Sequence, residues 1–395
     1  MKEQVFNTDH LEKVRRKRRR RKVRIAVVLG VLLAGALVWL TGIGSLYFTR
    51  IGSVLETWEL RLHPGNGFPV ALTMGTQTRS HALTGALVLM DDRDVYVYSD
   101  TGSALRNFQH GYARPGLAAG KTRFCIYNQG GRELRIEGRS QSYGTLNTAK
   151  AIQFAAMSAG GNFAVVTQSD TYQAQMTVYS DSMDELFSWY CANEYPTIAA
   201  FSPSGREVAV GCVTSGGGTL QSVLYLVNAD GERASLRRTD SLILQLTYRS
   251  SGQLAVAYDD AVVLYDARTL EVQAEYALPG SLLCCDLGGA NILLVQGNDS
   301  MGAGVELTVL SDALQPVRTV SVGDMVRQCA LQDGRAWLIG KNQIFCYTVE
   351  ETAGADTSFQ PEHRPICLIP GERKLLLLTA RQIVEITPPT EQQSE

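Results

Sequence analysis

The chain lacks the residue spacings on which zinc sites and serine hydrolases are commonly built. It has five histidines and eight cysteines, but no His-x-x-x-His, Cys-x-x-Cys or Gly-x-Ser-x-Gly sequence. The first two absences leave a zinc site without support, and the third does the same for a nucleophile elbow. The sequence therefore predicts no catalytic residue, no metal ligand and no cofactor-binding residue, and it identifies no small-molecule ligand.

Charged residues are also scarce, at 19% of 395 residues, and they are unevenly placed. Residues 1–24 hold 11 Lys and Arg against 3 Asp and Glu, which leaves 26 basic and 36 acidic residues, a net charge of −10, in the remainder. An acidic body repels polyanions, so nucleic acid is disfavoured as a partner. Hydrophobic residues make up 45% of the chain, enough for a sizeable core, which argues against global disorder.

The basic end directly precedes an uncharged segment. Residues 25–48 contain no Asp, Glu, Lys, Arg or His, and Arg50 closes the segment. As a helix these residues would be about 36 Å long, enough to cross a hydrocarbon core of about 30 Å. The sequence therefore predicts a basic cytoplasmic tail over residues 1–24 and a single transmembrane helix in the lipid bilayer over residues 25–48. Because positive charge stays inside, everything after Arg50 is expected to be extracellular.

Three other interpretations compete for this end of the chain. A cleavable signal peptide would need a shorter apolar core and a small-residue site, for which residues 42–45 are a weak candidate. A lipoprotein anchor is excluded because no cysteine lies near the apolar segment. Nuclear localisation or RNA binding stays an alternative if the basic run is considered alone. The position of the run beside a membrane span favours the topological role.

Eight glycines recur along the rest of the chain, each between two short apolar runs. They are Gly85, Gly120, Gly161, Gly205, Gly252, Gly289, Gly334 and Gly371. Their spacing of 35 to 47 residues is typical of four-stranded propeller blades. The clearest copy, residues 197–210, contains a Phe-Ser-Pro-Ser-Gly turn. We therefore predict an all-β propeller over residues 68–388, with residues 49–67 as a juxtamembrane connector and residues 389–395 as a disordered tail.

The last repeat stops one strand short. Residues 366–369, 375–378 and 382–387 supply three strands, and residues 69–73 can supply the fourth, which would pair an otherwise open edge. This count gives eight blades, and seven stays open because the first two repeats are the least regular. A β-sandwich or a parallel β-helix would not place turn glycines at this period.

The eight cysteines suggest disulfides in an extracellular protein. However, Cys285, Cys329 and Cys367 fall at matching places on the inner strands of successive blades, where neighbouring strands are expected to be too far apart for a disulfide. We therefore predict buried, reduced thiols. The pairs Asp91–Asp92 and Asp259–Asp260 fall in hairpin turns, where Asp commonly bonds the local backbone.

Three loops between second and third strands are predicted to be long. They cover residues 168–175, 214–221 and 297–304. Alternate turns of a blade emerge at opposite ends, so these three loops should project from the same face. Loops on a rigid scaffold often carry binding function, although tolerated surface insertion explains them equally well.

With its basic N-terminus, single span, acidic repeat body and Phe-Ser-Pro-Ser-Gly turn, the chain resembles a domain-of-unknown-function family. The members of that family are single-pass, membrane-anchored β-propeller proteins from clostridial Gram-positive bacteria. The resemblance covers nearly the whole chain, but it rests on structural motifs and carries over no functional residue. The turn is also similar to WD40 and TolB-like repeats, without the Trp-Asp and Gly-His signatures. With only Trp189 and Trp337 in the repeats, the tryptophan pattern of quinoprotein dehydrogenases is missing.

These observations predict a non-enzymatic extracytoplasmic scaffold or sensor that presents a propeller face to a protein or cell-wall ligand. The alternative is an extracytoplasmic hydrolase with acidic residues in the central channel. Channel carboxylates with raised pKa values in a deep pocket would favour the enzyme. A shallow, apolar loop rim would favour the scaffold.

Overall fold

The structure is a computed structural model that describes residues 56, 65–72, 79–250, 252–298, 304–350, 356–372 and 374–387. The chain divides into two units, Met1–Leu55 and Glu56–Glu395. The predicted cytoplasmic tail, transmembrane helix and C-terminal tail lie outside the described residues, as does most of the predicted connector. In the part of the chain that is described, no helix has the length and apolar character needed to cross a bilayer.

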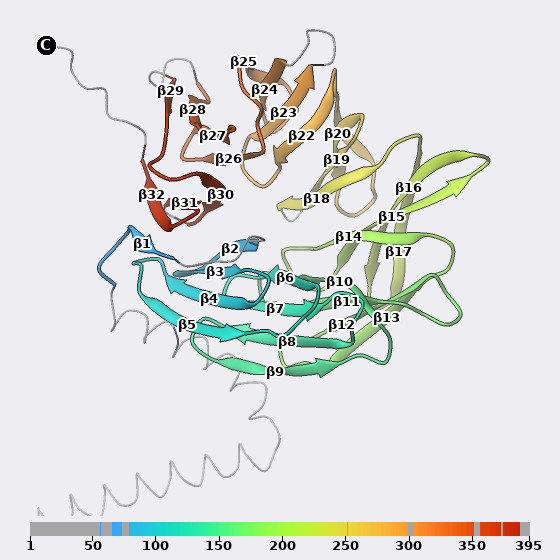
Figure 1. The fold of residues 1–395 in the computed structure, drawn as a ribbon. Coiled ribbons are helices and arrows are strands. Elements are labelled where there is room, and N and C mark those ends of the chain that lie inside the picture. Colours follow the sequence, from blue (N-terminus) through green and yellow to red (C-terminus); the bar gives the residue numbers. More distant parts are fainter. Residues whose placement is uncertain are drawn as a thin grey trace, which may run out of the picture. The chain divides into compact units, whose positions relative to one another are not determined.

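The second unit contains eight antiparallel sheets of four strands each (Figure 1). Blade one consists of β2 (Arg79–Leu83), β3 (Ala86–Met90), β4 (Asp94–Ser99) and β5 (Ala104–Gln109). Blade two consists of β6 (Pro115–Ala119), β7 (Arg123–Asn128), β8 (Glu133–Gly138) and β9 (Ser142–Asn147). Blade three consists of β10 (Ile152–Met157), β11 (Phe163–Thr167), β12 (Ala174–Tyr179) and β13 (Glu185–Cys191). Blade four consists of β14 (Tyr195–Phe201), β15 (Val208–Gly216), β16 (Thr219–Asn228) and β17 (Gly231–Thr239).

The next three blades repeat this arrangement. Blade five consists of β18 (Ile243–Ser250), β19 (Gln253–Tyr258), β20 (Ala261–Asp266) and β21 (Val272–Ala277). Blade six consists of β22 (Ser281–Asp286), β23 (Ile292–Asn298), β24 (Gly304–Leu310) and β25 (Pro316–Val322). Blade seven consists of β26 (Gln328–Gln332), β27 (Arg335–Ile339), β28 (Ile344–Thr348) and β29 (Thr357–Phe359).

Blade eight joins the two ends of the propeller. Its strands β30 (Pro365–Pro370), β31 (Leu375–Thr379) and β32 (Gln382–Ile386) are completed by β1 (Val70–Ala71). Val70 lies opposite Ile383 in this antiparallel pairing. The predicted closure by an N-terminal strand and the count of eight blades are confirmed, and the seven-blade alternative is wrong. The first two repeats, which looked irregular, form complete blades because their short strands still alternate with tight turns.

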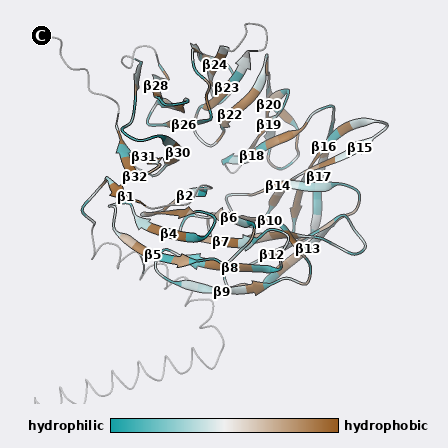
Figure 2. Ribbon diagram, in the orientation of Figure 1, coloured by the Kyte–Doolittle hydropathy of each residue, from teal (hydrophilic) through white to brown (hydrophobic). Residues whose placement is uncertain are grey.

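Burial follows the position of a strand within its blade. Every residue of β3, β11 and β31 is buried, whereas the outer strands β17 and β21 alternate between exposed and half-buried residues. The middle strands pack against neighbouring blades on both faces, so they are continuous apolar runs, which Figure 2 shows as brown segments inside the blades. The outer strands face water, which explains their weaker hydrophobic pattern.

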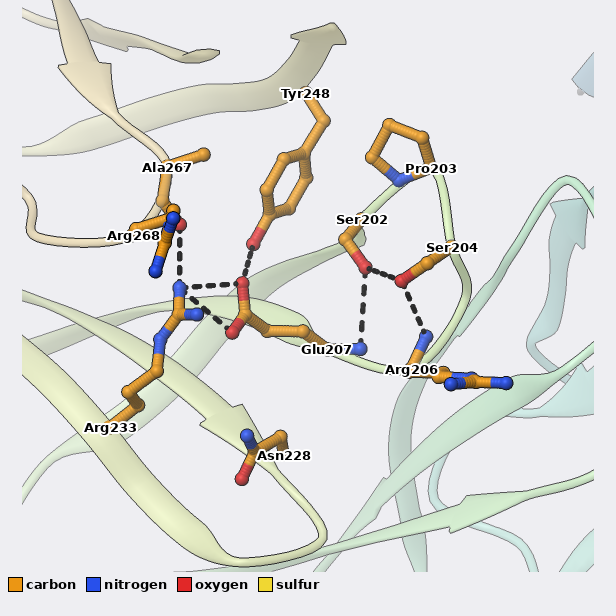
Figure 3. Close-up of a pocket in the computed structure, with 10 residues that line it drawn as sticks. All are labelled: Ser202, Pro203, Ser204, Arg206, Glu207, Asn228, Arg233, Tyr248, Ala267 and Arg268. Atoms are coloured by element: carbon orange, nitrogen blue, oxygen red, sulfur yellow. Dashed lines mark hydrogen bonds and ion pairs between the residues drawn. The ribbon is translucent and has the colours of Figure 1, made fainter. Parts of the chain in front are cut away.

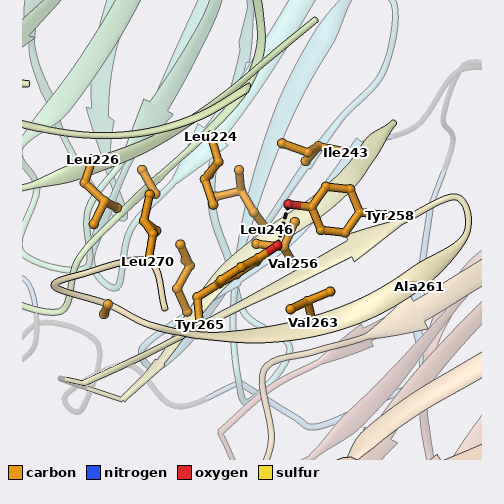
Figure 4. Close-up of a cluster of buried hydrophobic side chains, with 13 residues drawn as sticks. Leu224, Leu226, Ile243, Leu246, Val256, Tyr258, Ala261, Val263, Tyr265 and Leu270 are labelled. Carbon is orange, nitrogen blue, oxygen red and sulfur yellow. Dashed lines mark hydrogen bonds between the residues drawn. The ribbon is translucent and has the colours of Figure 1, made fainter. Parts of the chain in front are cut away.

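The core is a ring of eight hydrophobic clusters, one in each gap between neighbouring blades. Between blades four and five, Leu224 packs with Val256 and the rest of that cluster (Figure 4). Tyr258 and Tyr265 are buried there, and their hydroxyl oxygens lie 3.0 Å apart in a hydrogen bond. Since each blade buries its faces only against its neighbours, the stability of every blade depends on the closed ring.

All eight recurring glycines lie between the first and second strands of a blade, as the repeat predicts. Two of them show why glycine is needed. Gly205 has a φ of +69°, a left-handed conformation that favours glycine. A Cβ on Gly120 would lie 2.2 Å from the carbonyl oxygen of Ser158 in the next blade. The repeat is therefore a requirement of tight turns and close blade packing.

Successive turns of a blade lie at opposite ends of the ring. We call the end formed by the first-to-second and third-to-fourth strand turns the clasp end. The second-to-third strand turns and the links between blades form the connection end. The first strand of every blade lies at the inner edge and runs in the same direction, so each end is continuous around the ring.

Candidate functional site

At the clasp end, a side-chain hydrogen bond bridges every gap between neighbouring blades. In five of the eight gaps the donor is an arginine, and in seven the acceptor is a backbone carbonyl. In order around the ring, the bonds run from Arg106 to Gly138, Arg123 to Asp181, Asn162 to Gly205, Arg233 to Ala267, Arg249 to Gly289, Arg318 to Thr348, Gln332 to Gly371, and Thr84 to the carboxylate of Glu372. The tight turns at this end leave carbonyls without strand partners, and the long side chains of adjacent blades satisfy them.

A pocket of about 290 Å³ lies at the clasp end between blades four and five (Figure 3). One nitrogen of Arg233 lies 2.9 Å from a carboxylate oxygen of Glu207 and donates to the Ala267 carbonyl at 2.7 Å. The Tyr248 hydroxyl donates to Glu207 at 3.2 Å. Burial raises the pKa of Glu207, against the opposing effects of Arg233 and Tyr248. These groups point at one another, so the pocket is a structural clasp and offers no uncommitted nucleophile.

A buried ion pair joins Glu56 to Arg139 at the clasp end. Arg139 Nε lies 3.5 Å from a carboxylate oxygen of Glu56, and both side chains are buried. Arg139 also donates to the Thr84 carbonyl at 2.8 Å, which links blades one and two. Because removing one partner would strand a buried charge, this pair is expected to be sensitive to substitution.

The eight inner strands present their free edges to the central channel (Figure 1). All eight are described, and Asp286 is the only Asp or Glu among them. Its carboxylate accepts hydrogen bonds from the backbone amides of Leu331 at 2.9 Å and Gly288 at 3.1 Å. The described residues also contain no group of three or more His, Cys, Asp or Glu placed to hold a metal ion. The acidic channel on which the hydrolase alternative depended is therefore missing from the inner strands.

The inner strands of blades one to four line a cavity of about 520 Å³ in this channel. Arg79 and His81 of β2 contribute its ionisable side chains, and small or apolar residues supply most of the rest. Desolvation by the surrounding channel wall lowers the pKa of His81, so its imidazole is neutral near pH 7. Arg79 therefore carries the positive charge of this wall. No sequence signal had singled out either residue.

The connection end carries a group of exposed aromatic and aliphatic side chains that we call the rim. It consists of Tyr172, Tyr190, Tyr195 and Leu220, on blades three and four, which are between 41% and 53% exposed. The rings of Tyr172 and Tyr190 pack with centroids 5.1 Å apart. Among the described residues, no exposed large hydrophobic side chain lies in a turn of the clasp end.

The predicted long loops take different forms. Residues 168–173 form a loop between β11 and β12, as expected. Residues 214–221 do not: β15 and β16 continue to Gly216 and Thr219 and are joined by Gly217 and Gly218, with φ of +63° and +85°. This is a two-residue hairpin turn, which the consecutive glycines favour. The loop predicted in blade six lies largely outside the described residues, so its shape stays a prediction.

All eight cysteines are free thiols, and five of them are buried. Cys284 and Cys329 both pack into the hydrophobic cluster between blades six and seven. Cys191 and Cys212 both pack into the cluster between blades three and four, where the Cys191 thiol donates a hydrogen bond to the Glu194 carbonyl at 3.1 Å. Burial raises the pKa of Cys285 to about 12, which keeps that thiol protonated.

The acidic pairs also behave differently from each other. Asp91 accepts hydrogen bonds from two backbone amides of its own turn, as predicted. Asp259 accepts from the Leu242 amide at 2.7 Å, and Asp260 pairs with Arg238 at 2.8 Å. The second pair therefore fastens the link between blades four and five instead of its own turn. The position of Asp259 and Asp260 in a turn did not by itself predict these bonding partners.

The fold is similar to solved propellers of low sequence identity. Sqt1 from Saccharomyces cerevisiae matches with a TM-score of 0.60 and 8% identity, over 82% of this chain and 100% of that chain. The C-terminal WD40 domain of Sif2 matches with a TM-score of 0.59 and 12% identity, over 82% of this chain and 99% of that chain. BamB from Moraxella catarrhalis matches with a TM-score of 0.54 and 10% identity, over 81% of this chain and 99% of that chain. At these identities the likeness shows the fold alone, and no curated protein sequence matches the chain at a significant level.

The sequence itself allows a narrower assignment than these structures do. Residues 70–387, from β1 to just past β32, match the sequence profile of a family of unknown function, DUF5711. The resemblance to an uncharacterised family is confirmed to that extent, and membrane anchoring and clostridial origin stay predictions. The chain belongs to the DUF5711 family.

Proposed function

We propose that the protein is a membrane-tethered, extracytoplasmic propeller that acts as a binding scaffold or sensor. Its single N-terminal helix, residues 25–48, holds the propeller at the outer face of the cell membrane, and its basic tail stays in the cytoplasm. The support for this topology is the position of 11 basic residues within residues 1–24, directly before a segment without charge.

The rim at the connection end is the observation that carries the binding proposal. Tyrosines offer a large apolar surface, a hydroxyl for hydrogen bonding and few rotatable bonds, and they are enriched at protein interfaces. Ion pairs also lie at the connection end. One of them joins Arg237 and Glu194, with 2.9 Å between the guanidinium nitrogen and the carboxylate oxygen. An apolar group bordered by charged pairs is the usual anatomy of a protein-binding surface.

The partner is a protein or a cell-envelope ligand without dense negative charge. The body after residue 24 carries a net charge of −10, which would repel a polyanion. The inner strands give the hydrolase alternative no support, because their one carboxylate, Asp286, is bonded to backbone amides. The connection end is the better candidate for recognition, because it carries the exposed tyrosines of the rim.

The experiment is crosslinking on intact protoplasts with a membrane-impermeant reagent. A variant that combines Tyr172→Ser, Tyr190→Ser, Tyr195→Ser and Leu220→Ser should lose about tenfold or more of the captured partner. The matched control combines Leu186→Ser, Val272→Ser and Val317→Ser, which alter exposed side chains on outer strands. The control should capture normally, and both variants should unfold at nearly the wild-type temperature.

Two outcomes would contradict the proposal. Full capture by the rim variant would remove the rim as the contact surface. Crosslinking that requires a membrane-permeant reagent would place the propeller inside the cell and contradict the tethered, extracytoplasmic topology.

A further inference from the structure

Most polar side chains on the inner strands are already bonded to a neighbouring blade. Gln328 accepts from the Leu368 amide at 2.8 Å and donates to the Leu368 carbonyl at 3.0 Å. Gln245 accepts from the Cys285 thiol at 3.0 Å. Arg249, the other arginine of these strands, donates to the Gly289 carbonyl at 2.8 Å. These bonds hold the ring together and leave little polar surface uncommitted in the channel.

Arg79 and His81 are different. Neither side chain makes a hydrogen bond or an ion pair with any residue in the part of the chain that the structure describes. Both are exposed to the channel and line the cavity of about 520 Å³. His81 also lines a second cavity of about 400 Å³. Ala82 and Glu372 line this cavity as well, and it extends to the clasp end. The two cavities therefore meet at β2.

The other side chains that line the cavity of about 520 Å³ are apolar or small, with Ser80 as the one hydroxyl. Alanines and larger apolar residues of β6, β10 and β14 line the cavity beside Arg79. On the inner strands of blades five, six and eight, Leu244, Leu283 and Ile366 are 47%, 47% and 37% exposed. Exposed apolar side chains are costly to hydrate, because each keeps in water apolar surface that a ligand could cover.

We propose that the channel binds an amphipathic monoanion, a single carboxylate on an aliphatic chain, with the carboxylate on the guanidinium of Arg79. A guanidinium accepts a carboxylate in a two-point hydrogen bond, and one uncommitted cation matches one negative charge. The aliphatic chain extends along the alanines of β6, β10 and β14 toward Met157 and Phe201, which line the same cavity. The cavity lies within the range of ordinary ligand sites, which is roughly 300 to 1,000 Å³.

The proposal is tested with the full chain in lipid nanodiscs and with straight-chain carboxylates as probes. Binding of hexanoate, octanoate and decanoate is measured by calorimetry, with empty nanodiscs as a blank. Each buried methylene should tighten binding by at most about fourfold, so the affinity should rise steadily along the series. Octanol, which lacks the charge, should bind at least about tenfold more weakly than octanoate.

Two variants separate the charge from the apolar wall. Arg79→Gln should weaken octanoate binding by about tenfold or more and leave octanol unchanged, and Arg79→Lys should restore part of the difference. Met157→Ser, in the lining of the cavity, should flatten the dependence on chain length, whereas Val272→Ser, on an outer strand, should have no effect.

Three results would overturn the proposal. They are the absence of saturable binding, equal affinities for octanoate and octanol, and equal octanoate binding by the wild type and Arg79→Gln. The inference does not rest on the rim: the rim variant keeps the channel residues and should bind octanoate normally. Failure of one proposal can therefore be told from failure of the other.

Discussion

The clasp end and the connection end are built from the same strands, but their side chains serve different purposes. At the clasp end, donors such as Arg233 and Arg249 reach into the next blade and bond a turn carbonyl. At the connection end, Tyr172 and Leu220 project from blades three and four and leave much of their surface exposed. The difference shows that one end of the ring can maintain the contacts between blades while the other presents side chains to a partner.

The turns explain this division of roles. At the clasp end, the first-to-second strand turns repeat the same glycine, and neighbouring turns approach closely, as Gly120 does to Ser158. Short turns leave carbonyls at fixed positions, and an arginine of the adjacent blade can serve each one. At the connection end, links and loops differ in length, so their positions relative to the next blade vary. Some side chains there still bridge blades, as Arg238 does with Asp260, whereas others, such as Tyr172, remain exposed and available for recognition.

The largest expected effect comes from opening the ring, on which both ends depend. Deleting residues 68–72 removes β1 and exposes the edge of β32 together with the cluster that Val70 and Leu72 cover. We expect the full chain to lose cooperative thermal unfolding or to aggregate, measured by circular dichroism and light scattering. Ala71→Ser, at an exposed position of the same strand, is the matched control and should leave the melting curve unchanged. An unaltered transition in the deletion variant would mean that the ring closes without β1.

A smaller effect should distinguish the two ends directly. Arg233→Ala leaves the Glu207 carboxylate with Tyr248 alone and leaves the Ala267 carbonyl without its side-chain donor. Because Arg233 is partly exposed, we expect a loss of about 1–2 kcal/mol in the free energy of unfolding. Tyr172→Ser at the rim should change it by no more than about 0.5 kcal/mol. Equal losses in denaturant titrations of the two variants would contradict the assigned roles.

The smallest effect concerns the pH dependence of the clasp. Burial raises the pKa of Glu207 above its ordinary value of 4.5, so the folded state binds this proton more tightly than the unfolded state does. The stability that this group contributes is fully present below about pH 4.5 and is lost as the pH rises through the folded-state pKa. Relative to the wild type, Glu207→Gln should therefore lose less stability between pH 4 and pH 7.

Asp266, in a turn at the same end, supplies a control of opposite sign. Hydrogen bonds from the backbone amides of Arg268 and Thr269 lower its pKa. Its contribution is therefore present above the ordinary value of 3.8 and is lost as the pH falls. Melting temperatures of the wild type, Glu207→Gln and Asp266→Asn at several pH values measure both trends. The same slope in Glu207→Gln as in the wild type would contradict the assignment.

Much of the fold could be predicted from local sequence, because a blade is specified within one repeat. Gly205 and its flanking apolar runs marked a strand, a tight turn and a returning strand, and the structure has all three. The short last repeat predicted that a strand near Val70 would close the ring, since an open sheet edge is unfavourable. The extended hairpin at Gly217 and Gly218 was mistaken for a loop, although two adjacent glycines are also a hairpin signal.

The candidate sites were much harder to predict, since they depend on which residues the ring brings together. Tyr190 has the same local pattern as a core tyrosine, and only its place at the end of β13 leaves it exposed. Cys284 and Cys329 belong to different blades, and only the closed ring brings both to the cluster between blades six and seven. Nothing in the sequence distinguished Arg79 from the other arginines, whereas the structure places it in the channel with no hydrogen bond or ion pair to any described residue.

The sequence by itself determined the propeller class, the turns and the closing strand, because glycine conformation and strand alternation act over a few residues. Tertiary structure alone decided which arginine meets which carbonyl, which tyrosines remain exposed and which side chains face the channel. Those outcomes depend on contacts between residues that lie one blade apart, as Arg249 and Gly289 do. No local pattern encodes such contacts, since they arise from packing around the closed ring.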